Sequence, residues 1–235
     1  MTRRMRRSLL VLLAGILALT GCVQPQPKST ADQSGMTESQ VLDMPLEEQY
    51  AQAGERYEEL NDRFAEVQAE VFSDEWRDGA VSSELIPGQG YTRGDALEGD
   101  SRDNSYYFTV SRWYPTNENL KPILRDIAQS WESRGWRVKE ETSKVNGEIR
   151  IAATTEDGFW FSANEEQGTL HLTGNSPVFW GDRRPLSRAI AERRDAENAA
   201  GATWDTTDRD DEGHAYRLPG VYRPFPDWNT TLNDG

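Results

Sequence analysis

The chain has 235 residues, and its 40 acidic residues against 26 lysines and arginines give a formal net charge of −14 at pH 7. A chain of this charge repels polyanions, so we expect no nucleic-acid partner. It has only two histidines and one cysteine, and neither histidine belongs to a His-Glu-x-x-His helix. We therefore expect no metal site and no cofactor.

Residues 1–21 have the pattern of an export signal. Four arginines, Arg3, Arg4, Arg6 and Arg7, precede an apolar run at residues 9–19. As a helix this run would rise about 16 Å, roughly half the hydrocarbon thickness of a bilayer. The pattern therefore favours a signal peptide over a permanent transmembrane span.

The signal ends in Leu19-Thr20-Gly21-Cys22, which resembles the lipobox of bacterial lipoproteins. The resemblance implies that the Cys22 thiol receives a diacylglycerol, that the preceding peptide is removed and that fatty acyl chains such as palmitate hold the protein at the membrane. We expect a lipid-anchored protein on the extracytoplasmic face of the cell membrane. The alternative is a free thiol beside an ordinary secretory cleavage site. Removal of the signal leaves 22 basic and 40 acidic residues, a formal charge of −18.

Residues 22–44 are predicted to be a disordered tether that carries the lipidated cysteine. The segment is rich in Pro, Gln, Ser and Thr and short of large apolar residues, so it cannot bury enough surface to order itself. A coil of this length would hold the folded part about 25 Å from the anchor on average.

A long amphipathic helix is predicted next. Pro45 suits its first turn, and apolar residues follow at alternating spacings of four and three. They are Leu46, Tyr50, Ala53, Tyr57, Leu60, Phe64, Val67 and Val71. The mixture of aromatic and small residues in this stripe favours packing on a sheet, with a coiled-coil seam as the alternative.

One strand, a second helix and four further strands follow. Residues 104–114 have the composition of a strand. Asn119 and Gly135 are suitable caps for a helix that lies between them. After this helix the spacing of the apolar residues changes from a period of 3.6 residues to a period of two. This predicts strands at 136–142, 148–154, 159–163 and 169–173 joined by hairpin turns.

This order predicts an α+β fold over residues 45–180, in which two helices cover one face of an antiparallel sheet of about five strands that ends in a meander. Residues 181–235 are predicted to be an extension. It would contain a short helix at 186–200, an acidic linker at 204–214 and a segment rich in proline and aromatic residues at 217–228.

The lipobox, tether and element order, together with the ending LHLTGNSP at residues 170–177, look like the uncharacterised LppA-like lipoproteins of actinobacteria. The similarity covers roughly residues 1–180. The function of that family is unsettled, so it implies no catalytic residue.

The alternation of the strands predicts one surface that could bind a ligand. If the apolar residues of each strand face the helices, the residues between them emerge on the other face. The outward residues of interest are Tyr107, Trp113, Arg137, Lys139, Arg150, Trp160 and His171. Cations between aromatic rings could hold a carboxylate, a phosphate, a sugar of an envelope polymer or a partner protein. Alternatively, they form solvated cross-strand pairs, or the C-terminal segment with Trp204 and Trp228 covers them.

No catalytic motif accompanies this surface. The sequence contains neither a Gly-x-Ser-x-Gly elbow nor a histidine with an obvious acidic orienter. We expect a non-enzymatic binding or interaction module of the cell envelope. The alternative is a carboxylate-based hydrolase acting on envelope polymers, because two acids suffice for that reaction.

Overall fold

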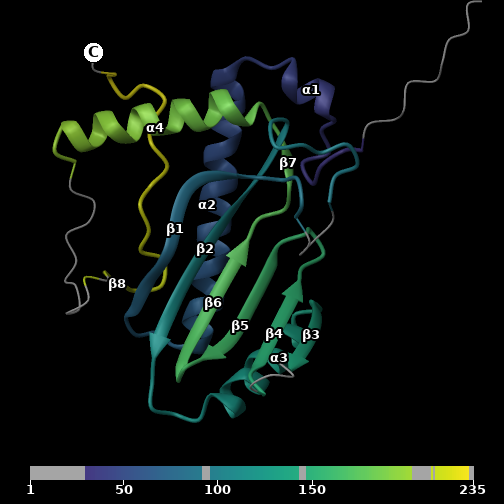
Figure 1. The fold of residues 1–235 in the computed structure, drawn as a ribbon, viewed down its shortest axis with the longest axis vertical. Helices are drawn as coiled ribbons and strands as arrows, with labels where there is room; N and C mark the ends of the chain where they lie inside the picture. Colours follow the sequence, from purple (N-terminus) through teal and green to yellow (C-terminus); the bar gives the residue numbers. More distant parts are fainter. Residues whose placement is uncertain (1–29, 92–95, 143–146, 203–212, 214, 233–235) are drawn as a thin grey trace, which may run out of the picture.

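The computed structural model, which describes residues 30–91, 96–142, 147–202, 213 and 215–232, has a mixed α+β fold (Figure 1). The helices of the described chain are α1 (Glu38–Leu42), α2 (Leu46–Val71), α3 (Leu120–Ser133) and α4 (Arg183–Ala199). The strands are β1 (Trp76–Pro87), β2 (Ser105–Pro115), β3 (Arg137–Thr142), β4 (Ile149–Thr154), β5 (Trp160–Glu166), β6 (Thr169–Asn175), β7 (Phe179–Trp180) and β8 (Tyr216–Arg217).

The strands form a single antiparallel sheet in the order β3-β4-β5-β6-β2-β1-β8, and β7 pairs with β2 beside this path. Strands β2 to β6 are the five that the sequence predicts, so the α+β class and the C-terminal meander are confirmed. The sheet of the described chain is larger than predicted, with eight strands, because β1, β7 and β8 add to it.

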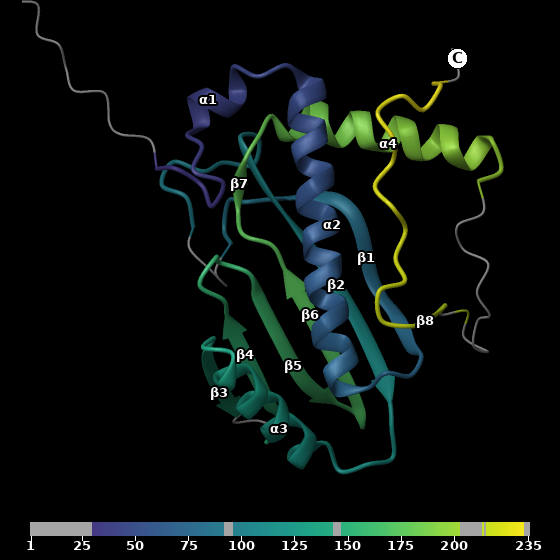
Figure 2. The same cartoon turned by 180° about the vertical axis from the view of Figure 1, so that it is seen from behind.

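The two predicted helices pack on one face of the sheet. Figure 2 shows α2 in front of β2 and β6 and α3 in front of β3, β4 and β5. Gly174 lets α2 approach β6 closely, since a Cβ at this position would lie 2.9 Å from Cδ2 of Phe64. Below α3, Phe161 stacks on Trp136 at 5.2 Å and contacts Trp131 at 6.4 Å between ring centroids. The predicted helix-facing alternation is therefore confirmed.

The ends of α3 follow from its sequence. The Asn119 side chain accepts a hydrogen bond from the backbone N–H of Lys121, which satisfies one of the free donors of the first turn. After the helix, Gly135 adopts the left-handed conformation with φ of 78°, where a side chain would be strained.

Strand β1 was not predicted, and its irregular pairing explains why. Its register against β2 shifts between Asp78 and Val81 and again between Ser82 and Ile86. The first shift inserts one residue and the second inserts two, so β1 lacks the uninterrupted period of two by which a strand is recognised in a sequence.

The predicted tether is wrong for residues 30–44, which pack on the sheet. The buried carboxylate of Asp32 accepts hydrogen bonds from the backbone N–H of Trp180 and from that of Ser34. The indole N–H of Trp180 donates to the carbonyl of Thr30 at 2.9 Å, and Val41 of α1 is fully buried. These contacts are tertiary and have no signal in composition. Residues 22–29 lie outside the described part of the chain.

The C-terminal residues are part of the fold, so the predicted boundary at residue 180 is also wrong. Helix α4 is longer than predicted and buries Leu186 and Ile190 in the main core. Residues 215–228, which we call the C-terminal strap, begin with β8 and then run beside α2 (Figure 2). On α2, Tyr50 contacts the rings of Phe225 and Trp228, each at 5.0 Å between centroids.

Hydroxyl groups on α2 hold the strap by its backbone. Tyr50 donates a hydrogen bond to the carbonyl of Pro226 at 2.9 Å, and Tyr57 donates to that of Arg223 at 2.8 Å. Burial raises the pKa of Tyr50 to about 12 and raises the pKa of Tyr57 as well. Both hydroxyls therefore stay protonated at a pH at which an exposed tyrosine ionises.

We expect the free energy of unfolding to fall steeply as the pH rises from about 10 to about 12. In this window the unfolded chain releases its tyrosine protons while the folded chain keeps them, so rising pH favours unfolding. Urea titrations followed by tryptophan fluorescence at intervals above pH 9 would measure the fall. Tyr50→Phe should make the slope shallower by about one proton, whereas equal stability at pH 9 and pH 11 would contradict the interpretation.

Candidate functional site

The face of the sheet opposite α2 and α3, which we call the outer face, carries three rows of side chains. Cross-strand partners in an antiparallel sheet point to the same side, so the register defines each row. The central row begins with Lys139 at the edge of the sheet and continues with the short side chains of Ala152, Ser162 and Thr173. Longer side chains flank it, with Arg137, Thr154, Trp160 and Asn175 on one side and Glu141, Arg150, Asn164 and His171 on the other.

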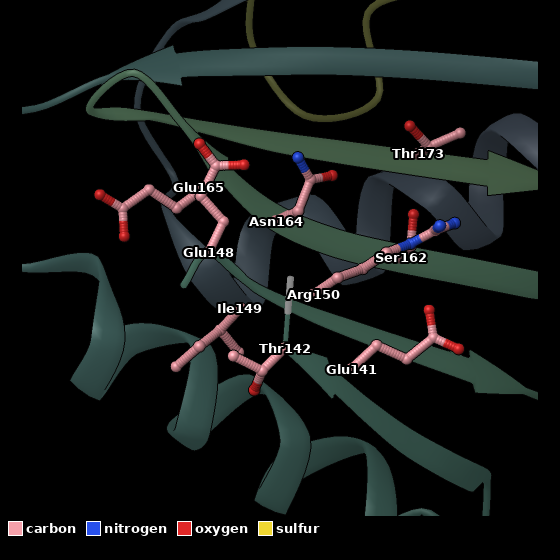
Figure 3. A pocket seen from close by; sticks show the side chains of 9 residues that line it. All are labelled: Glu141, Thr142, Glu148, Ile149, Arg150, Ser162, Asn164, Glu165 and Thr173. Atoms are coloured by element: carbon pink, nitrogen blue, oxygen red, sulfur yellow. The ribbon is translucent and has the colours of Figure 1, made fainter. Parts of the chain in front are cut away.

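Two adjoining pockets lie along the central row, because its side chains are shorter than those of its neighbours. The first, which we call the cationic pocket, has a volume of about 460 Å³ and is lined by Arg137, Lys139, Glu141, Arg150, Ala152, Thr154 and Trp160. The second, also about 460 Å³, is drawn in Figure 3 and includes Ser162, Asn164, Thr173, Glu148 and Glu165. Glu141 and Arg150 line both, so the two pockets are neighbours, and we refer to them together as the depression.

Arg150 occupies the junction of the two pockets. In Figure 3 its side chain extends along the sheet towards Ser162, across the central row. Its guanidinium carbon lies 5.1 Å from the ring centroid of Trp160, which is only 5 % exposed. This cation–π contact fixes the guanidinium over the floor of the depression while leaving its N–H donors available.

The charges in the cationic pocket do not balance. Lys139 Nζ contacts Glu141 Oε1 at 2.6 Å, and the hydrogen bond and charge of this lysine lower the pKa of Glu141. Among the described residues Arg137 and Arg150 form no ion pair within 4 Å, although the charge of Arg150 also lowers the pKa of Glu141. Residues 143–146, which connect β3 to β4, lie outside them and contain no acid. The cationic pocket is therefore lined by three described cations and one described carboxylate, on a strongly acidic protein.

The opposite end of the depression has acidic side chains. Figure 3 shows the carboxylates of Glu148 and Glu165 together on one side of the second pocket, away from that of Glu141. The depression thus runs from a cationic end at Arg137 and Lys139, past the Arg150 guanidinium and the hydroxyls of Ser162 and Thr173, to an acidic end. A ligand along it would meet charges of both signs.

Four of the seven predicted surface residues converge on the cationic pocket: Arg137, Lys139, Arg150 and Trp160. His171 lies in the next strand, and its Nε2 is 3.9 Å from the carboxylate of Glu166. Trp113 lies one strand further and donates from its indole nitrogen to the carbonyl of Asp78. These two share the outer face but do not line either pocket.

Tyr107 lies apart from the site. Its ring contacts that of Tyr91 at 4.6 Å, in a small second core with Val178 and Trp180. The segment after β1 supplies Tyr91, whose ring packs against that of Tyr107. Alternation predicts the direction of Tyr107 correctly but gives no information about the segment that packs against it.

The structure adds residues that the sequence reasoning did not single out. Ala152, Ser162 and Thr173 form the floor, and Glu141 pairs with Lys139. The available signal was the short side chains at outward positions of three successive strands, which create space between longer neighbours.

The described part of the C-terminal segment does not cover this face. Trp228 contacts Tyr50 of α2 on the opposite side of the sheet, and the guanidinium of Arg193 lies 3.8 Å from its ring. Trp204 and the predicted lipidation site Cys22 lie outside the described residues.

Within the described ranges, no group of three or more His, Cys, Asp or Glu side chains is placed to hold a metal ion. In the same part of the chain, each helix is too short or too polar to cross a bilayer. No protein-family model and no curated protein sequence matches this chain.

Proposed function

We propose that this chain is a non-enzymatic binding module of the cell envelope, anchored to the extracytoplasmic face of the cell membrane by lipid on Cys22 and similar to the LppA-like lipoproteins. Its ligand or partner surface is the outer face of β3 to β6. The observation that carries the binding surface is the convergence of Arg137, Lys139 and Arg150 on one pocket of an otherwise acidic molecule. Such an arrangement attracts an anionic group locally.

The packed N-terminal segment limits how far the fold can lie from such an anchor. Only eight Cα–Cα steps separate Cys22 from Thr30, which accepts the hydrogen bond from Trp180. Fully extended, they span at most about 29 Å. The end of the fold with α1 and β7 would then be nearest the bilayer, and the outer face would extend away from it (Figure 1).

The charge state of Glu141 disfavours the alternative hydrolase reaction in the cationic pocket. A carboxylate-based glycosidase needs one acid whose pKa is raised so that it can donate a proton. The contact with Lys139 instead lowers the pKa of Glu141, which favours a role in fixing the position of Lys139. The pocket is better suited to binding than to proton transfer.

Site-specific photo-crosslinking in intact cells tests the proposal. A photoreactive amino acid at Thr154, within the cationic pocket, should give a discrete crosslinked product. The matched control replaces Gln129, which is exposed on α3 on the opposite side of the sheet. The product should depend on the position of the probe and should decrease in a Cys22→Ala chain, because an unanchored protein is diluted away from an envelope target.

Equal products at the two positions would contradict the assignment of the outer face. The absence of any reproducible product at Thr154, with the chain present in the envelope fraction, would remove the binding function itself.

A further inference from the structure

We infer that the ligand of the outer face is an oligosaccharide with sparse anionic groups, either carboxylate or phosphate, whose acidic group lies in the cationic pocket. This inference rests on the proposed function and specifies its ligand. The argument depends on three properties of the depression: which donors are unused, how long it is and how its charges are arranged.

The unused donors favour an oxyanion. Arg137 and Arg150 both line the cationic pocket, and neither forms an ion pair within 4 Å in the described structure. A guanidinium presents a planar set of N–H donors that matches the two oxygens of a carboxylate or phosphate. Because Trp160 holds the Arg150 side chain, little conformational entropy is lost when an anion binds there.

The length of the depression favours an oligomer over a single ion. The central row crosses β3, β4, β5 and β6, and three strand spacings amount to about 14 Å. Its floor is formed by Ser162, which is only 3 % exposed, and offers the hydroxyls of the half-buried Thr173 and, beside Trp160, Thr154. Hydroxyls both donate and accept hydrogen bonds, as the hydroxyls of a sugar chain require.

The arrangement of charge limits how densely charged this ligand can be. Glu148 and Glu165 would repel an anionic group at their end of the depression, so a uniformly charged polymer fits poorly. An anionic bilayer is also disfavoured, because surface binding to it uses clusters of four to eight basic residues, whereas the cationic pocket contributes three. The best fit places an acidic sugar at Arg137 and Arg150 and neutral sugars over Ser162 and Thr173.

Isothermal titration calorimetry on the full chain in non-ionic detergent tests this inference. The probe is 3′-sialyllactose, a trisaccharide whose single carboxylate is on its terminal sugar, and the neutral control is the trisaccharide 2′-fucosyllactose. We expect the acidic probe to bind at least tenfold more tightly than the neutral one, and more weakly as the salt concentration rises.

Variants locate the site. Arg150→Gln and Arg137→Gln should each weaken binding of the acidic probe about tenfold or more, because each removes charge-assisted hydrogen bonds. Arg150→Lys should restore only part of the affinity, since it keeps the charge without the planar donors. Arg125→Gln, on the exposed side of α3, is the matched control and should bind like the parent chain. Thermal melts of all variants would show that folding is retained.

Equal affinity for the acidic and neutral probes, or an Arg150→Gln chain that binds as well as the parent, would overturn the inference. Binding to vesicles of anionic lipid in preference to the oligosaccharide would also overturn it, because the anion would then be a headgroup. If the oligosaccharide fails while the crosslink at Thr154 persists, only the ligand class is wrong. Loss of both would remove the proposed function.

Discussion

Deletion of residues 213–235 is expected to leave the chain largely unfolded at physiological temperature. The deletion removes the strap, so Tyr50 and Tyr57 lose the carbonyls that accept their hydrogen bonds. Each such loss costs about 1–3 kcal/mol. The rings of Phe225 and Trp228 also leave Tyr50, at about 0.5–1.5 kcal/mol for each aromatic pair. The total of several kcal/mol is comparable with the 5–15 kcal/mol by which most proteins are stable.

Circular dichroism melts of the deleted chain and of a control that lacks only residues 230–235 would measure this effect. The control keeps the whole strap and should melt cooperatively near the temperature of the parent chain. A deleted chain that melts as cooperatively and at the same temperature as the control would show that the strap is an accessory extension.

Asp78→Asn is expected to lower the free energy of unfolding by about 3–5 kcal/mol, the usual cost of removing one partner from a buried ion pair. Asp78 contacts both Arg112 at 3.3 Å and Arg217 of β8 at 2.9 Å. The two arginines are 3 % and 1 % exposed. Burial lowers the pKa of Arg112, and Asp78 opposes this effect. Without the aspartate charge, both buried cations would lose this carboxylate.

Urea denaturation at pH 7 would measure the change, with Glu75→Gln as the control. Glu75 is an exposed acid close to Asp78 in sequence, so its neutralisation should alter stability by less than about 0.5 kcal/mol. If Asp78→Asn were no more destabilising than Glu75→Gln, Asp78 could not be the carboxylate that stabilises these arginines.

The elements that the sequence predicted are those whose signals are local. Helix α2 buries Tyr50, Tyr57 and Phe64 at spacings that only a helix places on one side. In the meander, short turns join strands whose apolar residues recur with a period of two. The sequence therefore indicates which side chains lie on each face of the sheet. Strand β1 and the two packed ends depend on partners far away in sequence. Asp32 is ordered by Trp180, and no property of residues 30–44 alone indicates that contact.

The part of the candidate site that has a local signal could also be predicted from the sequence. The pleat determines that Arg137, Arg150 and Trp160 share a face, so their direction could be predicted from alternation. The pocket itself depends on the register between strands, which brings Ala152 beside Ser162 and leaves space above them. Register is a property of pairs of strands, so the sequence of either strand does not show it. The sequence of these strands also does not indicate that the loop after β1 places Tyr91 on Tyr107.

Metabolic labelling with a fatty-acid probe tests the central claim, that this binding module is attached to a bilayer through Cys22, most directly. Cells that express the parent chain should yield labelled protein in the membrane fraction, since two or three acyl chains give stable attachment. The Cys22→Ala chain should be unlabelled and should leave that fraction. An unlabelled parent chain, or one recovered from the cell interior, would contradict the account.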